Sequence, residues 1–227
     1  LVQCAGYMRM YHPIYLKLLR QACSKYNIHL IADEIAVGFG RTGSMFAYEQ
    51  SKITPDIICL SKGITGGYMT LSTILTTDEI YNAFYDEYTK LNAFLHSHSY
   101  TANPIACAAA NASLDLFEKN NVIEKNKILS NYIHNSLKEL SEHPHVSDIR
   151  QHGMIAAIEV VKNKLTKEPY DWKERRGMLA YQFGLKNNVL IRPLGNVIYF
   201  MPPYVIKKKE IDKVINVIKA AIDVATK

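Results

Sequence analysis

Short apolar runs alternate with longer amphipathic stretches along the chain, and this alternation constrains the fold more than any other feature. The apolar runs cover residues 28–32, 56–60, 69–75, 155–161, 189–192 and 197–201. Short apolar strands joined by helical stretches are typical of a mainly parallel sheet covered on both faces. The sequence therefore predicts an α/β fold.

Helix start and stop signals divide the amphipathic stretches. Residues 12–26 open at His12-Pro13 and carry an apolar side made of Ile14, Leu18, Leu19 and Ala22. Asn103 is a good N-cap, and Pro104 at the first helical position loses no needed hydrogen bond, so a long helix begins there. Further helices are predicted over residues 122–142, 172–187 and 209–226. The last has an apolar stripe of Ile211, Val214, Ile215, Ile218, Ile222 and Val224.

Composition and charge exclude several classes of protein. With 48% hydrophobic and 21% charged residues, the chain is neither a disordered tail nor a collagen-like rod nor a coiled coil. A net charge of +6 is too small to indicate nucleic-acid binding. No uncharged apolar stretch approaches the roughly 18 residues of a membrane span, and no secretory signal peptide opens the chain. We therefore expect neither nucleic acid nor a membrane as partner.

The cysteines and histidines predict no metal site. The four cysteines form no CxxC pair and have no zinc spacing, which favours a reducing, cytoplasmic location. Cys59 in an apolar run and Cys107 in an Ala-rich stretch are expected to be buried thiols. His96 and His98 resemble a metal-binding pair, but no third ligand is evident.

Three polar side chains stand at the ends of predicted strands, where open α/β sheets bind ligands: Asp33, Lys62 and Arg192. A lysine amine forms a Schiff base with an aldehyde cofactor. A carboxylate keeps the ring nitrogen of pyridoxal phosphate (PLP) protonated, so that the ring accepts electrons. The 29 residues from Asp33 to Lys62 are enough for a turn, a connector and an adjacent strand.

Residues 31–43 (IADEIAVGFGRTG) and 55–63 (PDIICLSKG) resemble the signature and the lysine motif of the class III PLP-dependent aminotransferases. Residues 65–72, 96–110 and 191–204 resemble the post-lysine loop, the phosphate-contact loop and the substrate-carboxylate motif of one branch of that family. The resemblance runs from about residue 2 to the end, but it covers only the carboxyl-terminal half of the family's length.

The resemblance implies a fold type I PLP-dependent transferase. Residues 1–118 would be the carboxyl-terminal part of the PLP-binding large domain, with a mainly parallel sheet, and residues 119–227 a smaller α/β domain. A partial large domain would have an exposed sheet edge and uncovered apolar surface.

The resemblance also implies a reaction. The finer match is to the branch that converts 8-amino-7-oxononanoate to 7,8-diaminononanoate in biotin biosynthesis, with S-adenosylmethionine as amino donor. Two alternatives stay open: another class III aminotransferase with lysine or an ω-amino acid as donor, and a catalytically inactive fragment that serves as a binding or assembly module.

The resemblance gives three residues a role at the cofactor ring. Lys62 would be the Schiff-base nucleophile and then the base, and burial beside a cationic ring would lower the pKa of its amine. Asp33 would pair with the ring nitrogen, or else cap a turn. Ile35 would pack against one ring face, or else belong to the ordinary core.

Other residues would hold the phosphate and the substrate. Ser99, with a backbone contact from His98, matches the family's phosphate-binding position, which reaches across a homodimer interface so that active sites are shared. Ser97 stands where the family usually has Gly beside the substrate. Arg192 would hold a substrate carboxylate with its planar fork of donors, or else form a surface ion pair. Tyr199 would line the pocket, or else belong to the core.

Overall fold

The computed structural model describes residues 2–227 and divides into two compact units. The Lys62 unit holds residues 12–39 and 44–122, and the Arg192 unit holds residues 2–11, 40–43 and 123–227. The division into a cofactor domain and a small domain stays a prediction, because compactness does not show what each unit binds.

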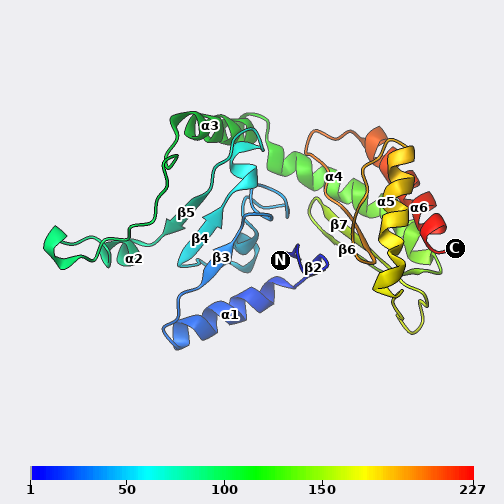
Figure 1. Cartoon of the computed structure of the whole chain (residues 1–227), viewed down its shortest axis with the longest axis horizontal. Coiled ribbons are helices and arrows are strands. Elements are labelled where there is room, and N and C mark those ends of the chain that lie inside the picture. The colour runs from blue at the N-terminus through cyan, green and yellow to red at the C-terminus, as the bar shows by residue number, and fades with distance from the viewer. Residues whose placement is uncertain (1) are drawn as a thin grey trace. The chain divides into compact units, whose positions relative to one another are not determined.

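The Lys62 unit contains one small sheet with helices around it (Figure 1). The strand order is β3-β4-β5, with β3 parallel and β5 antiparallel to β4. Its elements are α1 (Pro13–Lys25), β3 (Ile31–Asp33), η1 (Ala47–Ser51), β4 (Ile57–Leu60), η2 (Lys62–Thr65), β5 (Thr73–Thr76), α2 (Asp78–Asn82), η3 (Tyr88–Lys90) and α3 (Pro104–Lys119).

The predicted mainly parallel sheet is wrong for the described residues, in which β3 and β4 make the one parallel pair. A parallel connection usually needs a crossover helix. The chain between β4 and β5 contains only the short helix η2 and turns, so it reverses direction. What the structure has is a mixed α/β fold.

The two helix starts that were predicted from capping residues, at His12 and Asn103, are confirmed. At α1, His12 Nδ1 accepts a hydrogen bond from Ile14 N at 3.2 Å. At α3, Asn103 Oδ1 accepts from Ile105 N at 3.0 Å and from Ala106 N at 3.2 Å. These caps satisfy amide groups that have no partner within the helix.

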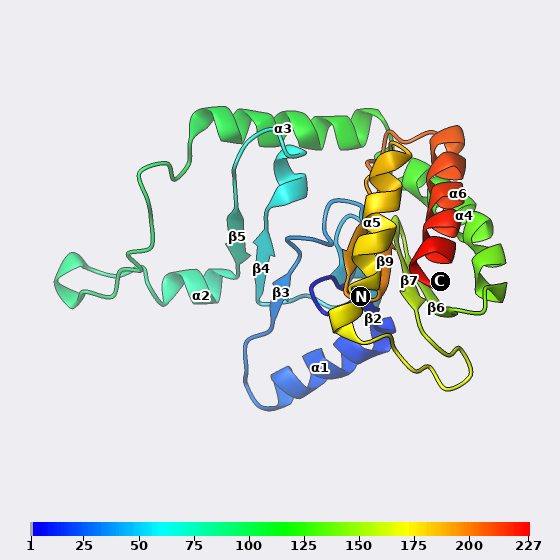
Figure 2. The ribbon, with the colours of Figure 1, turned by 45° about the vertical axis from the view of Figure 1, so that its right-hand side comes forward.

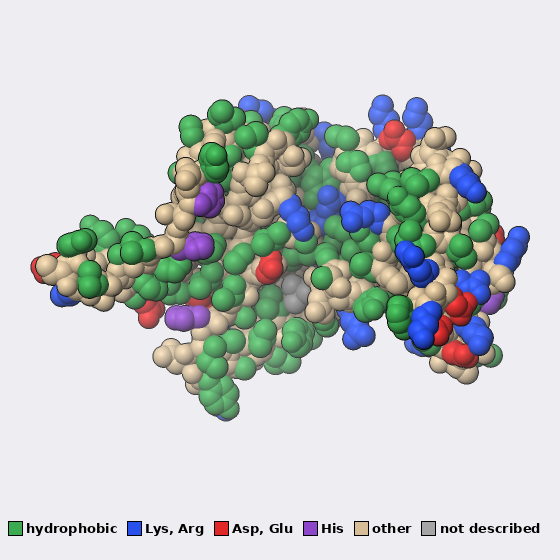
Figure 3. Space-filling model, viewed as in Figure 1, with side chains coloured by type: hydrophobic (Ala, Val, Ile, Leu, Met, Phe, Trp, Pro, Cys, Tyr) green, Lys and Arg blue, Asp and Glu red, His purple; other side chains and the backbone are tan. Residues whose placement is uncertain are grey.

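The Lys62 unit exposes much apolar surface. The predicted apolar side of α1 is uncovered, with Leu18 57% exposed, and Figure 3 shows apolar side chains gathered over this helix and over the α2 segment. The outer strands are also uncovered, with Ile31 of β3 59% exposed and Ile74 of β5 60% exposed. The expected coverage of the sheet on both faces is therefore not seen among the described residues.

The Arg192 unit contains a four-stranded antiparallel sheet in the order β6-β7-β9-β8, with three long helices beside it (Figure 2). A separate two-stranded ladder pairs β1 with β2. The elements are β1 (Val2–Gln3), β2 (Arg9–Met10), α4 (Val122–Leu137), η4 (Lys138–Glu142), β6 (Val146–His152), β7 (Ile155–Val160), η5 (Trp172–Glu174), α5 (Arg176–Lys186), β8 (Arg192–Leu194), β9 (Val197–Phe200) and α6 (Lys208–Ala225).

Helix α6 packs its apolar stripe into the core of this unit. Four predicted stripe residues are buried: Ile211, Ile215, Ile218 and Ile222. Val224 is 38% exposed, and Ala225 is buried in its place. The helical period of 3.6 residues explains the exchange, because position 225 continues the series 211, 215, 218 and 222 while position 224 does not.

Several strands differ from the sequence prediction, and β5 begins only at Thr73 although the apolar run begins at residue 69. β6 was not predicted, because VSDIRQH has no apolar run. This strand forms one edge of the sheet, and its polar side chains bond to neighbouring groups of the protein: Arg150 pairs with Glu159, and Gln151 Nε2 donates to Ser130 O at 2.7 Å. Residues 189–191 are not a strand, although Val189 and Ile191 are buried in the core, and β8 begins only at Arg192. No helix in the described part of the chain is long and apolar enough to cross a bilayer.

His152 at the end of β6 predicts a stability change with pH. Burial lowers its pKa from 6.5 to about 4. Between these values the unfolded chain binds a proton that the native protein excludes, so stability falls as the pH drops from 6.5 to 4. Because the side chain is only half-buried, we expect a loss of about 1–2 kcal/mol, less than the full linkage value.

Urea unfolding of the wild type and of His152→Gln at pH 7 and pH 4.5 measures this loss, which the variant should lack. His134→Gln, at an exposed position of α4, is the matched control and should behave like the wild type. Equal pH dependence in wild type and His152→Gln would contradict the prediction.

Candidate active site

Asp33 and Lys62 lie at the same end of the parallel strand pair. Asp33 is in register with Cys59 of β4, and Glu34 N donates a hydrogen bond to Cys59 O at 3.0 Å. Lys62 follows Cys59 by three residues. At a rise of ~3.3 Å per residue and ~4.8 Å between strands, the Cα atoms of Asp33 and Lys62 lie on the order of 10 Å apart. The register thus brings the predicted carboxylate and amine to the carboxyl end of the parallel strand pair.

Lys62 opens η2 in the left-handed conformation, with φ of 48°. The turn around it is held by Ser61 Oγ, which donates to Leu71 O at 2.8 Å, and by Thr65 Oγ1, which donates to Met69 O at 2.6 Å. The prediction that Lys62 is buried is wrong for the described part of the chain, residues 2–227, because its side chain is exposed there. Its Nζ has no hydrogen-bond or ion-pair partner in this part of the protein.

Asp33 is exposed at the end of β3, and its Oδ1 accepts a hydrogen bond from Ile35 N at 3.0 Å. Its Oδ2 has no partner among the described residues. Ile35 is half-buried in the turn that follows. An unpaired carboxylate oxygen and an unpaired amine at one sheet edge suit a protonated ring nitrogen and an aldehyde, so these residues fit PLP.

Ser97, His98 and Ser99 lie on the long segment between α2 and α3, which projects away from the β3-β4-β5 sheet in Figures 1 and 2. All three are exposed. His98 N donates to Thr101 Oγ1 at 3.0 Å, so this amide already has an acceptor. Ser99 has no hydrogen-bond partner in the described part of the chain. The structure does not bring this segment to Asp33 and Lys62.

Arg192 and Tyr199 are cross-strand partners in the Arg192 unit. β8 pairs with β9 in the register that sets Arg192 opposite Tyr199, and Arg192 Cζ lies 6.0 Å from the centre of the Tyr199 ring. Arg192 is exposed, and no acidic side chain of residues 2–227 pairs with it. Its guanidinium therefore keeps its donors for an external carboxylate.

Arg41 has contacts that the sequence analysis missed, although it stands in the glycine-rich motif. Its Nη1 donates to Pro202 O at 2.7 Å, and its guanidinium lies 4.4 Å from the centre of the Tyr204 ring. Burial lowers the pKa of Arg41. Its carbonyl accepts from Met154 N at 2.9 Å, and a Cβ on Gly153 would come within 2.6 Å of that carbonyl oxygen. Within the Arg192 unit, these contacts fix residues 40–43 to the segment after β9.

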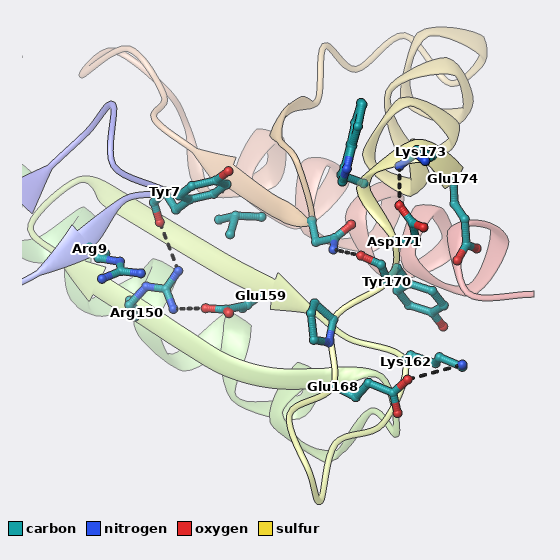
Figure 4. A pocket seen from close by; sticks show the side chains of 14 residues that line it. Tyr7, Arg9, Arg150, Glu159, Lys162, Glu168, Tyr170, Asp171, Lys173 and Glu174 are labelled. Atoms are coloured by element: carbon teal, nitrogen blue, oxygen red, sulfur yellow. Dashed lines mark hydrogen bonds and ion pairs between the residues drawn. The ribbon is translucent and has the colours of Figure 1, made fainter.

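A cavity of about 810 Å³ in the Arg192 unit has none of the predicted site residues in its wall (Figure 4). Arg150 pairs with Glu159 and donates to the carbonyl oxygen of Tyr7. Lys162 Nζ lies 3.3 Å from Glu168 Oε1. These charges therefore have partners within the wall of the cavity. Residues 2–227 contain no group of three or more side chains suited to a metal ion.

Comparisons with known proteins give one consistent family. Residues 1–222 match the family described as Aminotransferase class-III. The adenosylmethionine-8-amino-7-oxononanoate aminotransferase of Helicobacter pylori is 54% identical over 219 residues, which are 95% of this chain and 48% of that protein. The chain spans about half the length of the curated relatives it matches.

Solved structures are similar over the same extent. The crystal structure of adenosylmethionine-8-amino-7-oxononanoate aminotransferase from Methanocaldococcus jannaschii has a TM-score of 0.92 and 42% identity, over 96% of this chain and 51% of that one. The omega transaminase from Pseudomonas jessenii in complex with PMP has a TM-score of 0.92 and 29% identity, over 98% and 49%.

Proposed function

Because the chain belongs to the class-III aminotransferases, we propose that it transaminates 8-amino-7-oxononanoate to 7,8-diaminononanoate, with S-adenosylmethionine as amino donor and PLP as cofactor. This reaction is a step of biotin biosynthesis. The observation that carries the proposal is the register of β3 and β4, which brings Asp33 and Lys62 to one sheet edge. In this proposal residues 1–118 belong to the cofactor domain and residues 119–227 form the small domain.

Three residues of this chain have separate proposed roles at the cofactor. PLP, when bound, supplies an aldehyde that reacts with amines and a ring that accepts electrons. Lys62 Nζ would hold the cofactor through its aldehyde, and the same nitrogen would take up and return the proton of the reacting carbon. Asp33 Oδ2 keeps the ring nitrogen protonated. Ile35 packs against one face of the ring.

Ser97, His98 and Ser99 have proposed roles between subunits. The unpartnered Ser99 lies shortly before α3, where the positive end of the helix dipole favours an anion such as the cofactor phosphate. Since this segment projects from its own sheet, we assign its phosphate contact to the site of a second copy in a homodimer. Ser97 then borders the substrate of that site. His98 contributes its backbone once Thr101 releases it.

Arg192 is proposed to bind the carboxylate of both substrates, with Tyr199 as the adjoining wall. We expect Arg192→Gln to raise the KM for 8-amino-7-oxononanoate by roughly 10- to 100-fold, because a bidentate charge-assisted contact is lost. Steady-state kinetics at saturating donor measure the effect. Arg175→Gln, at another exposed arginine of the same unit, should leave KM unchanged. A KM for Arg192→Gln equal to the wild-type value would remove Arg192 from the substrate site.

A donor experiment tests the proposed function. The purified protein receives 8-amino-7-oxononanoate with either S-adenosylmethionine or lysine as sole amino donor, and 7,8-diaminononanoate is measured by mass spectrometry. We expect product with S-adenosylmethionine only. Product with lysine only would assign another class-III reaction, an alternative supported by the equal TM-score of the omega transaminase. Failure with both donors, and without PLP attachment, would favour a binding or assembly module.

A further inference from the structure

Glu34 is a buried carboxylate between two proposed cofactor residues. It is 3% exposed, whereas Asp33 before it is exposed and Ile35 after it is half-buried. Its Oε2 accepts a hydrogen bond from Ala47 N at 3.0 Å, and its Oε1 accepts from Tyr48 N at 2.9 Å. These amides open η1, where no earlier helical carbonyl is available to them. Both oxygens of the buried carboxylate are therefore satisfied by backbone groups.

The backbone of Glu34 is held as firmly as its side chain. Its N–H donates to Cys59 O of β4 at 3.0 Å, and its carbonyl accepts from Gly38 N at 2.8 Å. A Cβ at position 38 would come within 2.8 Å of that carbonyl oxygen, so the close approach requires glycine. Glu34 is thus bonded to three segments: β4, the glycine-rich turn and η1.

The hydrogen bonds of Glu34 determine the direction in which the side chain of Asp33 points. Successive side chains of an extended segment point to opposite sides, so an inward Glu34 directs Asp33 outward. The hydrogen bond from Ile35 N to Asp33 Oδ1 depends on the same turn and leaves Oδ2 without a partner. A rotation of the Glu34 peptide would move the carboxylate of Asp33 and the side chain of Ile35 together.

We propose that Glu34 is a positioning residue, which anchors the end of β3 to η1 and so aims Asp33 Oδ2 at the cofactor ring nitrogen. This inference rests on the proposed function, and it adds a residue that touches neither cofactor nor substrate. Burial raises the pKa of Glu34, while the two amide hydrogen bonds oppose that shift. The competing interpretation is that Glu34 only anchors η1.

A double-mutant cycle separates the two interpretations. The Kd for PLP is measured by absorbance titration for wild type, Asp33→Asn, Glu34→Gln and the double variant, and thermal unfolding confirms that each is folded. Glu34→Gln turns one acceptor into a donor that faces an amide N–H. We expect it to weaken PLP binding about 10-fold in the wild-type background and less than 2-fold in the Asp33→Asn background.

Glu49→Gln, at an exposed glutamate of η1, is the matched control and should leave the Kd unchanged. A second probe is the PLP analogue with carbon in place of the ring nitrogen, which Glu34→Gln should bind as well as the wild type does. Equal weakening by Glu34→Gln in both backgrounds would overturn the inference, because Glu34 would then not act through Asp33.

Two further outcomes are decisive. If Glu34→Gln does not fold, Glu34→Asp, which keeps the charge, takes its place in the cycle; if neither folds, Glu34 is an anchor of the fold and the inference is overturned. If Asp33→Asn binds PLP as tightly as the wild type does, the proposed function loses its cofactor carboxylate, a failure distinct from that of Glu34.

Discussion

Lys62→Arg is expected to abolish borohydride-stable attachment of PLP to the chain and to lower transamination by roughly 10³-fold or more. The guanidinium keeps the positive charge, but it is neither a nucleophile nor a base at neutral pH. The measurement is reduction of the PLP-treated protein, digestion, and mass spectrometry of the peptide that contains position 62. In the wild type we expect the label on that peptide alone.

Lys52→Arg is the matched control. Lys52 is exposed in the same unit and shares the left-handed backbone of Lys62, with φ of 51°. It should keep both the label and the activity, because it precedes the start of β4, whereas Lys62 follows the end of that strand. A wild-type label spread over many surface lysines would contradict the role of Lys62.

Asp33→Asn is expected to lower turnover on the order of 10²-fold or more, because an amide cannot keep the ring nitrogen charged. The effect should fall mainly on kcat, since the electron-accepting strength of the ring is needed for the chemical step. Steady-state kinetics and the absorption spectrum of the bound cofactor measure it.

Two further variants test this prediction, one as a partial rescue and one as a control. Asp33→Glu, which retains a carboxylate on a longer arm, should recover part of the lost turnover. Asp115→Asn, at an exposed aspartate of α3, should behave like the wild type. Unchanged kcat and spectrum in Asp33→Asn would show that this carboxylate does not contact the ring.

Local signals made the helices predictable. His12 and Asn103 cap α1 and α3 as expected, because an N-cap side chain bonds to amides only two or three residues away. The stripe of α6 was predicted for the same reason, since helical periodicity is a local property. The predicted stripe was wrong at Val224, which is exposed, because the helical period of 3.6 residues places Ala225 on the buried face instead.

Non-local contacts made the strands harder to predict. The reversal of β5 follows from the short connection after β4, and β6 lacks an apolar run because it lies at the sheet edge. The contacts of Glu34 with η1 and of Arg41 with Pro202 join residues 13 and 161 positions apart, and no sequence period reports such pairs. The glycine-rich motif marked both residues but not their partners.

By itself the sequence determined which residues bear the chemistry: a carboxylate after one apolar run, a lysine after the next, and the glycine-rich turn between them. Only the tertiary structure decided that they meet. The ladder of β3 and β4 sets Asp33 opposite Cys59, three residues before Lys62, and the bonds of Glu34 hold that end of the ladder in place. Strand pairing is a contact between distant parts of a chain, so its register becomes defined only when the chain folds.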